Sequence, residues 1–234
     1  TGMQLQKELD VESDALDDNY TPYQIEFPLD AGCRKKISIV CTIEDAYEKD
    51  AFATAAAEMA RFDALEKKAG YHDELAETLT IAADHFLAYR QSTGLMTVLA
   101  GLPWFTDWGR DTMIALTGLT LATGRYQDAR DILTTFARYV HHGMVPNMFP
   151  DEGTAPLYNT ADASMWYFYA VGKYLDYTGT PEDYAFVQET IYPKLKEIIA
   201  AYEHGTDFSI YMEEDGLIHA GSGLDQVTWM DVRV

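Results

Sequence analysis

The spacing of apolar residues changes once along this chain, and the change limits what the chain can fold into. After Glu44, apolar residues recur about every 3.6 positions, the period of one face of an α-helix. These runs predict helices over about 51–69, 72–87, 110–121, 129–140, 160–177 and 181–202. A chain of 234 residues can bury a sizeable core, so we expect a mainly α-helical fold.

The connections between the predicted helices fall into two kinds. Those at 122–125 and 178–181 are short, as antiparallel helix hairpins require. Pro181 is a suitable first helical residue, whereas Pro193 should kink or split the last run. The connections at 91–109, 142–159 and 204–230 are long and rich in polar and aromatic residues, and binding sites usually lie on such loops. No fixed-period repeat is present, which disfavours a regular solenoid.

The region before the helices has a different pattern. Residues 1–19 are polar and acidic, and alternating apolar runs follow at 23–29 and 36–43 around a turn at 30–32. This pattern predicts a short β-hairpin. We therefore divide the chain into residues 1–45, an acidic arm and hairpin that belongs to or links an upstream β domain, and residues 46–234, a helical domain.

The composition limits the classes of molecule that the chain can bind. A net charge of −21 repels nucleic acid and anionic lipid surfaces but not a neutral substrate. On one strand, Cys33 and Cys41 would lie about 26 Å apart, and a disulfide needs Cα atoms within about 7 Å. Free thiols favour a reducing compartment, and we predict a cytoplasmic location. No transmembrane run or signal-peptide core is present, although a leader removed before Thr1 stays an alternative.

The richest segment, residues 101–112, joins aromatic and charged side chains in a loop that leads into a helix. Arginine and aspartate can fork onto neighbouring sugar hydroxyls, and flat rings can pack on the apolar face of a sugar. The alternatives are capping of the helix by the aspartate and ordinary core packing of the rings. The candidate residues are Trp104, Phe105, Asp107, Trp108, Arg110 and Asp111.

Two later segments carry further carboxylates. Asp162 falls in the predicted first turn of a helix capped by Asn159 or Thr160, where an acid is favoured anyway. Our hypothesis is that it faces the same pocket as Asp111. Asp231 follows Trp229, and a less polar environment lets a carboxyl group keep its proton longer, as a general acid must. The alternative is an ordinary surface aspartate.

Four blocks match a known family in order. They are Trp-Phe-Thr-Asp-Trp-Gly-Arg-Asp (104–111), Val-Pro-Asn-Met-Phe-Pro-Asp (145–151), Tyr-Asn-Thr-Ala-Asp-Ala-Ser-Met-Trp (158–166) and Thr-Trp-Met-Asp (228–231). Together they resemble the amylo-α-1,6-glucosidase domain of glycogen debranching enzymes over residues 90–234. The resemblance implies the N-terminal portion of an (α/α)6 toroid of the glucoamylase clan, preceded here by the short hairpin.

The resemblance also implies an activity. It is the removal of α-1,6-linked glucose from glycogen or limit dextrin by inversion, with two carboxylates about 6.5–9.5 Å apart. Arg110 and Asp111 would hold the terminal glucose, and Asp231 would be the general acid. The pocket would be lined by Trp104, Trp108, Asp162 and Trp229, and Phe105 and Asp107 of the same loop are also expected to bind substrate. No cofactor is implied.

Some alternatives and expectations remain. The family's general base should lie beyond Val234, so we expect a fragment that is inactive alone and self-associates through exposed half-barrel surface. Another (α/α)6 enzyme, such as a trehalase or disaccharide phosphorylase, or a non-catalytic glucan-binding module would also fit. A metal or nucleotide site finds no support. His141 and His142 are expected side by side on a helix, and no zinc-spaced cysteines or glycine-rich loop occur.

Overall fold

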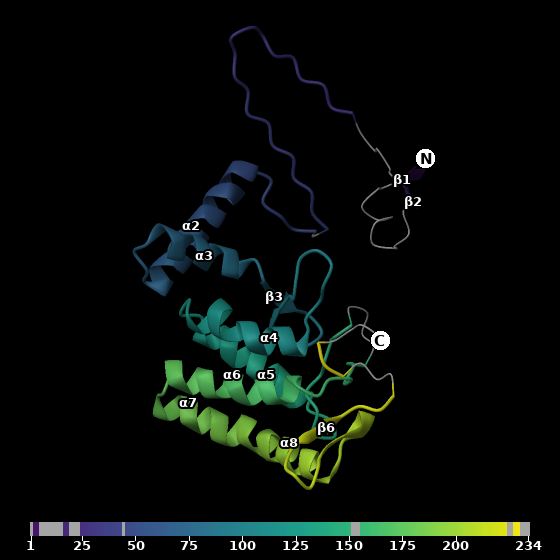
Figure 1. Ribbon diagram of the computed structural model, residues 1–234. Helices are drawn as coiled ribbons and strands as arrows, with labels where there is room; N and C mark the ends of the chain where they lie inside the picture. Colours follow the sequence, from purple (N-terminus) through teal and green to yellow (C-terminus); the bar gives the residue numbers. More distant parts are fainter. Residues whose placement is uncertain are drawn as a thin grey trace. The chain divides into compact units, whose positions relative to one another are not determined.

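The computed structural model describes residues 2–4, 16–18, 24–43, 45–150, 155–223 and 227–229. The chain forms two compact units, Thr1–Thr54 and Ala55–Val234. Helices dominate the second unit, which confirms the predicted mainly helical fold (Figure 1). Within the part of the chain that is described, no helix is long and apolar enough to cross a lipid bilayer.

The first unit contains a small antiparallel pair of strands. Strand β1 (Gly2–Gln4) pairs with β2 (Leu16–Asp18), with Met3 opposite Asp17. The hairpin predicted at 23–29 and 36–43 forms only its turn, where the Cys33 amide donates to the Asp30 carbonyl at 3.1 Å. No strand occurs within residues 24–43. The apolar side chains there, such as Ile25 and Ile39, stay exposed, and a two-stranded hairpin without burial is marginal at best.

The helices α2 (Ala51–Ala69) and α3 (Glu74–Asp84) follow the predicted runs. The Asp73 carboxylate caps α3 by accepting from the Leu75 and Ala76 amides, both at 3.1 Å. This helix ends before the predicted residue 87, because the chain turns into strand β3 (Leu87–Arg90). Strand β3 pairs with β4 (Leu95–Val98), a hairpin that the helical spacing did not reveal.

The core of the second unit forms around three helical segments. They are α4 (Gly109–Leu116) with its π-helical continuation η1 (Thr117–Leu121), α5 (Tyr126–Arg138) and α6 (Ala163–Tyr177). One face of α5 is fully buried, at Ile132, Leu133 and Phe136. The Tyr167 hydroxyl of α6 donates to the Leu133 carbonyl at 2.8 Å, so the two helices are tied by a buried polar contact as well as by packing.

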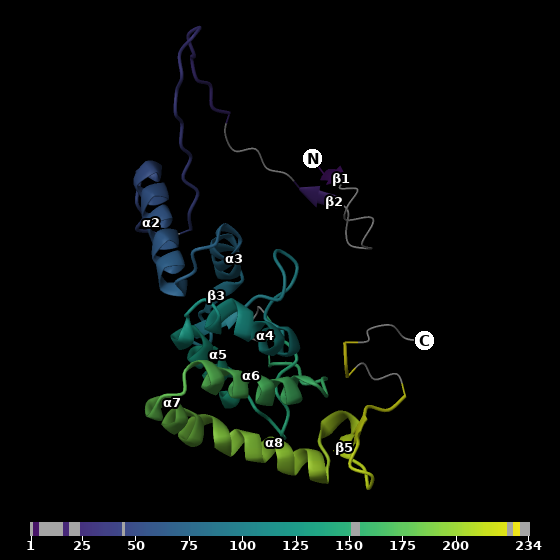
Figure 2. The same ribbon diagram turned by 60° about the vertical axis from the view of Figure 1, so that its left-hand side comes forward.

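The last predicted helix is split, as Pro193 suggested. It consists of α7 (Pro181–Phe186), the π-helical η2 (Val187–Ile191) and α8 (Tyr192–His204), with Pro193 in the first turn of α8. Thr180 and Asp183 form a reciprocal capping box at the start of α7. In both ribbon views α6 lies between α4 and the segment formed by α7, η2 and α8 (Figures 1 and 2).

Two further features differ from the sequence-based expectation. The connection after α8 contains a 3-10 turn η3 (Asp207–Ser209) and a hairpin of β5 (Ile210–Met212) and β6 (Ile218–Ala220). The pair His141 and His142 was expected on a helix. Instead it lies beyond the end of α5, in a turn where His141 and Met144 exchange backbone hydrogen bonds. The two imidazole rings stack with centroids 3.9 Å apart.

Candidate functional site

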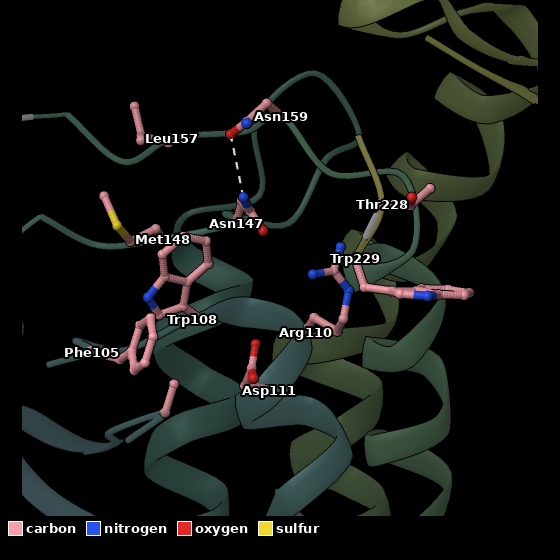
Figure 3. Close-up of a pocket in the computed structure, with 11 residues that line it drawn as sticks. Phe105, Trp108, Arg110, Asp111, Asn147, Met148, Leu157, Asn159, Thr228 and Trp229 are labelled. Carbon is pink, nitrogen blue, oxygen red and sulfur yellow. Dashed lines mark hydrogen bonds between the residues drawn. The ribbon is translucent and has the colours of Figure 1, made fainter. Parts of the chain in front are cut away.

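A cavity of about 460 Å³ lies at the start of α4. It collects residues from all four family-like blocks, 104–111, 145–151, 158–166 and 228–231. Figure 3 shows the Arg110 guanidinium and the Asp111 carboxylate between Trp108 on one side and Trp229 on the other. The cavity is lined by Ala100, Phe105, Trp108, Arg110, Asp111, Asn147, Met148, Leu157, Asn159, Thr228 and Trp229.

The predicted site residues therefore separate into three groups. Phe105, Trp108, Arg110, Asp111 and Trp229 line the cavity. Three others do not line it: Trp104 is exposed, and Asp107 and Asp162 each form an ion pair with an arginine. The proposed general acid, Asp231, lies outside the described residues.

Backbone contacts bring the first two blocks, 104–111 and 145–151, together. The Gly109 amide donates to the Asn147 carbonyl at 2.8 Å, and Trp108 forms an antiparallel bridge with Met148. A Cβ atom on Gly109 would lie 2.0 Å from the Pro146 carbonyl oxygen. Only glycine allows this approach without displacing backbone, so the Gly109 in the sequence block serves to close the cavity wall.

Asp107 is buried behind this wall rather than in the cavity. Its side chain is 1% exposed and accepts a forked pair of hydrogen bonds from Arg90, one of them from Nε at 2.7 Å, and a third from the Thr97 hydroxyl at 2.8 Å. The Phe149 amide donates to the Asp107 carbonyl at 3.1 Å. The Arg90 guanidinium also contacts the carbonyl oxygens of Phe149 and Pro150. This network fixes the β3–β4 hairpin, the loop and the 147–150 segment against one another.

Arg110 is held by a second carboxylate. Its Nε and Nη2 atoms donate to the two carboxylate oxygens of Asp162, at 2.6 and 2.7 Å. The Thr160 hydroxyl donates to Asp162 at 3.0 Å and also lies 3.4 Å from Arg110 Nη2. A bidentate arrangement of this kind fixes the plane of the guanidinium. Asp162 thus orients a cavity residue from outside the cavity.

The charge state of Asp162 follows from the same contacts. Burial alone would raise the pKa of its carboxyl group. The hydrogen bonds and positive charge of Arg110, with a further hydrogen bond from Thr160, outweigh the burial and hold that pKa below its usual range. Asp162 is at the N-cap of α6, where its side chain makes no capping bond. The predicted cap, Thr160, accepts instead from the Ala163 amide at 3.4 Å.

Asp111 has different surroundings. It lies in the first turn of α4 and is exposed to the cavity, and the start of this helix has no side-chain capping bond. Among the described residues no basic side chain forms an ion pair with it. The capping alternative therefore gains no support, and the carboxylate can accept hydrogen bonds from a ligand.

Asn147 and Asn159 complete the polar lining. Neither was predicted as a site residue, and Asn159 was considered only as a helix cap. The Asn147 side-chain amide donates to Asn159 Oδ1 at 3.4 Å (Figure 3). The buried Oδ1 atom of Asn147 has no partner within the described part of the chain. Both residues belong to the family-like blocks, which is the one signal that could have found them.

The opposite side of the cavity depends on the start of α6. The Ala161 amide donates to the Val227 carbonyl at 2.7 Å, which places Thr228 and Trp229 at the cavity. The Ala161 carbonyl accepts from the Tyr202 hydroxyl of α8 at 2.7 Å, and burial raises the pKa of that phenol to about 12. The hydroxyl therefore keeps its proton at physiological pH and remains a donor.

Comparisons with known proteins agree with the sequence blocks. A family model described as amylo-alpha-1,6-glucosidase matches residues 81–234, a range that contains every residue lining the cavity. The glycogen debranching enzyme of Saccharomyces cerevisiae (strain ATCC 204508 / S288c) is 29% identical over 66% of this chain. The chain spans about 14% of the length of that relative. The chain belongs to the amylo-alpha-1,6-glucosidase family.

Proposed function

We propose that the cavity binds the terminal glucose of an α-1,6-linked branch of glycogen or limit dextrin. The observation that carries this proposal is the pairing of Arg110 and Asp111 on one helix start, beside the ring of Trp108. A guanidinium donates and a carboxylate accepts, so the pair can bind two adjacent hydroxyl groups. An aromatic wall then packs on the apolar face of the sugar.

Hydrolysis, in this proposal, follows the inverting course expected of the family. Asp231 protonates the glycosidic oxygen, and a second carboxylate activates water on the opposite face of the sugar. The first product is then β-glucose, which proton NMR distinguishes from α-glucose. Asp111 is engaged with sugar hydroxyls and does not act as the base. Asp111 is the one carboxylate among the described residues that line the cavity, so we expect this chain by itself to bind the sugar without hydrolysing it.

Calorimetric titration with isomaltose, an α-1,6-linked disaccharide, tests the binding part. The Asp111→Asn and Arg110→Met variants should bind about ten- to a hundredfold more weakly, the usual cost of losing a hydrogen bond to a charged group. The control is Glu189→Gln, a change in η2 at a residue that does not line the cavity. Unchanged affinity in both cavity variants would remove the basis of the proposal.

A glucose-release assay on limit dextrin tests the catalytic part. We expect no release by this chain. Release that disappears on Asp231→Asn would show that the chain is a complete glucosidase with Asp231 essential, and would overturn the expected inactivity. In a longer protein that carries this chain and is active, Asp231→Asn should abolish turnover and retain binding. Unchanged turnover there would favour the non-catalytic glucan-binding alternative.

Two further expectations belong to the proposal. Ile114 on α4 and Met165 and Tyr169 on α6 are exposed apolar side chains, which supports self-association of the chain. Light scattering that shows a monomer at all concentrations would contradict it. The free, exposed thiols Cys33 and Cys41 support a cytoplasmic location for the protein.

A further inference from the structure

A second hollow surface lies on the β3–β4 hairpin, with a lining distinct from that of the cavity. It consists of two adjoining depressions of about 470 and 230 Å³, and Ser92 lines both. We call the two together the hairpin groove. Among the described residues none lines both the groove and the cavity. The groove is lined by Ala88, Tyr89, Arg90, Gln91, Ser92, Thr93, Thr97, Leu99, Thr135, Arg138 and Tyr139.

The larger depression combines an exposed ring with neutral polar groups. Tyr89 is 66% exposed although it lies in a paired strand. Gln91 and Ser92 follow it at the turn and are both exposed. An exposed ring, an exposed amide and the Ser92 hydroxyl in one lining offer a stacking face together with donors and acceptors. This combination suits a sugar, whose ring is apolar on its faces and polar around its rim.

The smaller depression holds polar groups that lack partners. The Thr135 side chain is 3% exposed, and its hydroxyl has no hydrogen-bond partner in the described part of the chain. Buried hydroxyl groups are usually satisfied by protein, water or ligand. Arg138 is exposed beside it, and among the described residues no carboxylate forms an ion pair with it. That is unusual in a chain with 38 acidic residues.

The surrounding charge favours a neutral ligand over an oxyanion. Arg138 and Thr135 lie at the C-terminal end of α5, where backbone carbonyls carry a partial negative charge. The chain as a whole has a net charge of −21. Both fields repel a phosphate or carboxylate, whereas hydroxyl groups can accept from Arg138 and donate to nearby oxygens at no such cost.

We propose that the hairpin groove binds the main chain of an α-glucan through neutral sugar units, while the cavity holds a branch end. The proposal rests on the proposed function, because it takes its ligand class from there. In physical terms the groove increases the residence of the polymer on the protein by adding a second contact, which raises the effective concentration of branch ends at the cavity.

Binding of this chain to glycogen, measured by affinity electrophoresis, tests the groove against the cavity. Tyr89→Ala and Arg138→Ala should each weaken glycogen binding about three- to tenfold, the usual size of a lost ring contact or hydrogen bond. Neither variant should change the affinity for isomaltose, which occupies the cavity. Tyr184→Ala removes another exposed tyrosine, 56% exposed on α7, and is the matched control.

Each outcome decides between the two sites. Glycogen binding that is unchanged in both groove variants, with isomaltose binding intact, overturns the groove and leaves the cavity proposal standing. A chain that binds neither ligand overturns both. Competition of inorganic phosphate with glycogen that is lost in Arg138→Ala would identify an oxyanion site and contradict the neutral-ligand proposal.

Discussion

Two arginine–aspartate pairs lie beside the cavity, and they differ in what they do. In the Arg90–Asp107 pair the side chains are 12% and 1% exposed, and neither residue lines the cavity. In the Arg110–Asp162 pair they are 14% and 17% exposed, and Arg110 still lines the cavity. The first pair holds the backbone segments in place, and the second orients a group that can meet a ligand. Similar ion pairs can therefore belong to the scaffold or to the site.

The largest difference between the pairs should appear in stability. Asp107→Ala removes a carboxylate that is only 1% exposed and takes the acceptor away from Arg90 and Thr97, which should cost about 3–5 kcal/mol of unfolding free energy. Asp162→Ala leaves a charge that can reach water through the cavity and should cost about 1–3 kcal/mol. Urea denaturation of both variants measures the difference. Equal losses would contradict the expectation that the more deeply buried pair contributes more to stability.

The double variant Arg90→Met with Asp107→Leu sharpens this test, because it removes both charges at once. It should recover much of the stability lost by Asp107→Ala, since apolar pairs often replace buried ion pairs at little cost. If the double variant binds isomaltose more weakly than the wild-type chain although its stability has recovered, the pair positions Trp108 and Asn147. If the double variant and the wild-type chain bind isomaltose equally well, the pair has a purely structural role.

The junction at Gly109 should be the next most sensitive point. Gly109→Ala places a methyl group against the Pro146 carbonyl, and such overpacking costs about 1–3 kcal/mol. The matched control is Gly172→Ala in α6, where a Cβ meets no atom within 4 Å. That change should stabilise the helix by up to about 1 kcal/mol. Thermal melting measures the stability of the two variants. Equal effects would contradict the close contact between residue 109 and the Pro146 carbonyl.

The two tryptophans of the loop should differ in ligand binding. Trp108 lines the cavity, whereas Trp104 is 70% exposed and does not. Trp108→Ala should weaken isomaltose binding about tenfold, the upper range for a lost ring contact. Trp104→Ala should leave it unchanged. A larger loss of affinity in Trp104→Ala than in Trp108→Ala, measured by calorimetric titration, would instead support the sequence-based prediction that Trp104 lines the pocket.

The smallest expected effect concerns pH. The pKa of Asp162 is lowered on folding, so its contribution to stability is complete above the ordinary pKa of an aspartate. That contribution is lost as the pH falls through the lowered pKa. The stability gap between the wild-type chain and Asp162→Asn should therefore be constant near neutrality and shrink below about pH 4. A gap that widens in acid would contradict the Arg110–Asp162 pairing.

The sequence predicted much of this fold because its helices are amphipathic over long stretches. Helix α5 follows the predicted run closely, since one face is wholly buried. The β3–β4 hairpin was missed because Phe86 and Leu87 continue the helical spacing of α3. The hairpin predicted at 23–29 and 36–43 did not form within residues 24–43 for the opposite reason: alternation is present, but apolar side chains such as Ile25 and Ile39 stay exposed.

The sequence predicted which residues contribute to the candidate site but not how they are arranged. The blocks located Arg110 and Asp111, which line the cavity. They could not separate Asp107 from Asp111, because the partners that bury Asp107 are Arg90 and Thr97, outside the blocks. Long-range contacts of this kind leave no trace in local spacing. The role of Asp231 stays a prediction.

A structure of this chain with isomaltose bound would test the central claim most directly. We predict a sugar ring beside Trp108, with its hydroxyl groups within hydrogen-bond distance of both the Arg110 guanidinium and the Asp111 carboxylate. Isomaltose bound elsewhere, or in the cavity without contact to Asp111, would contradict it.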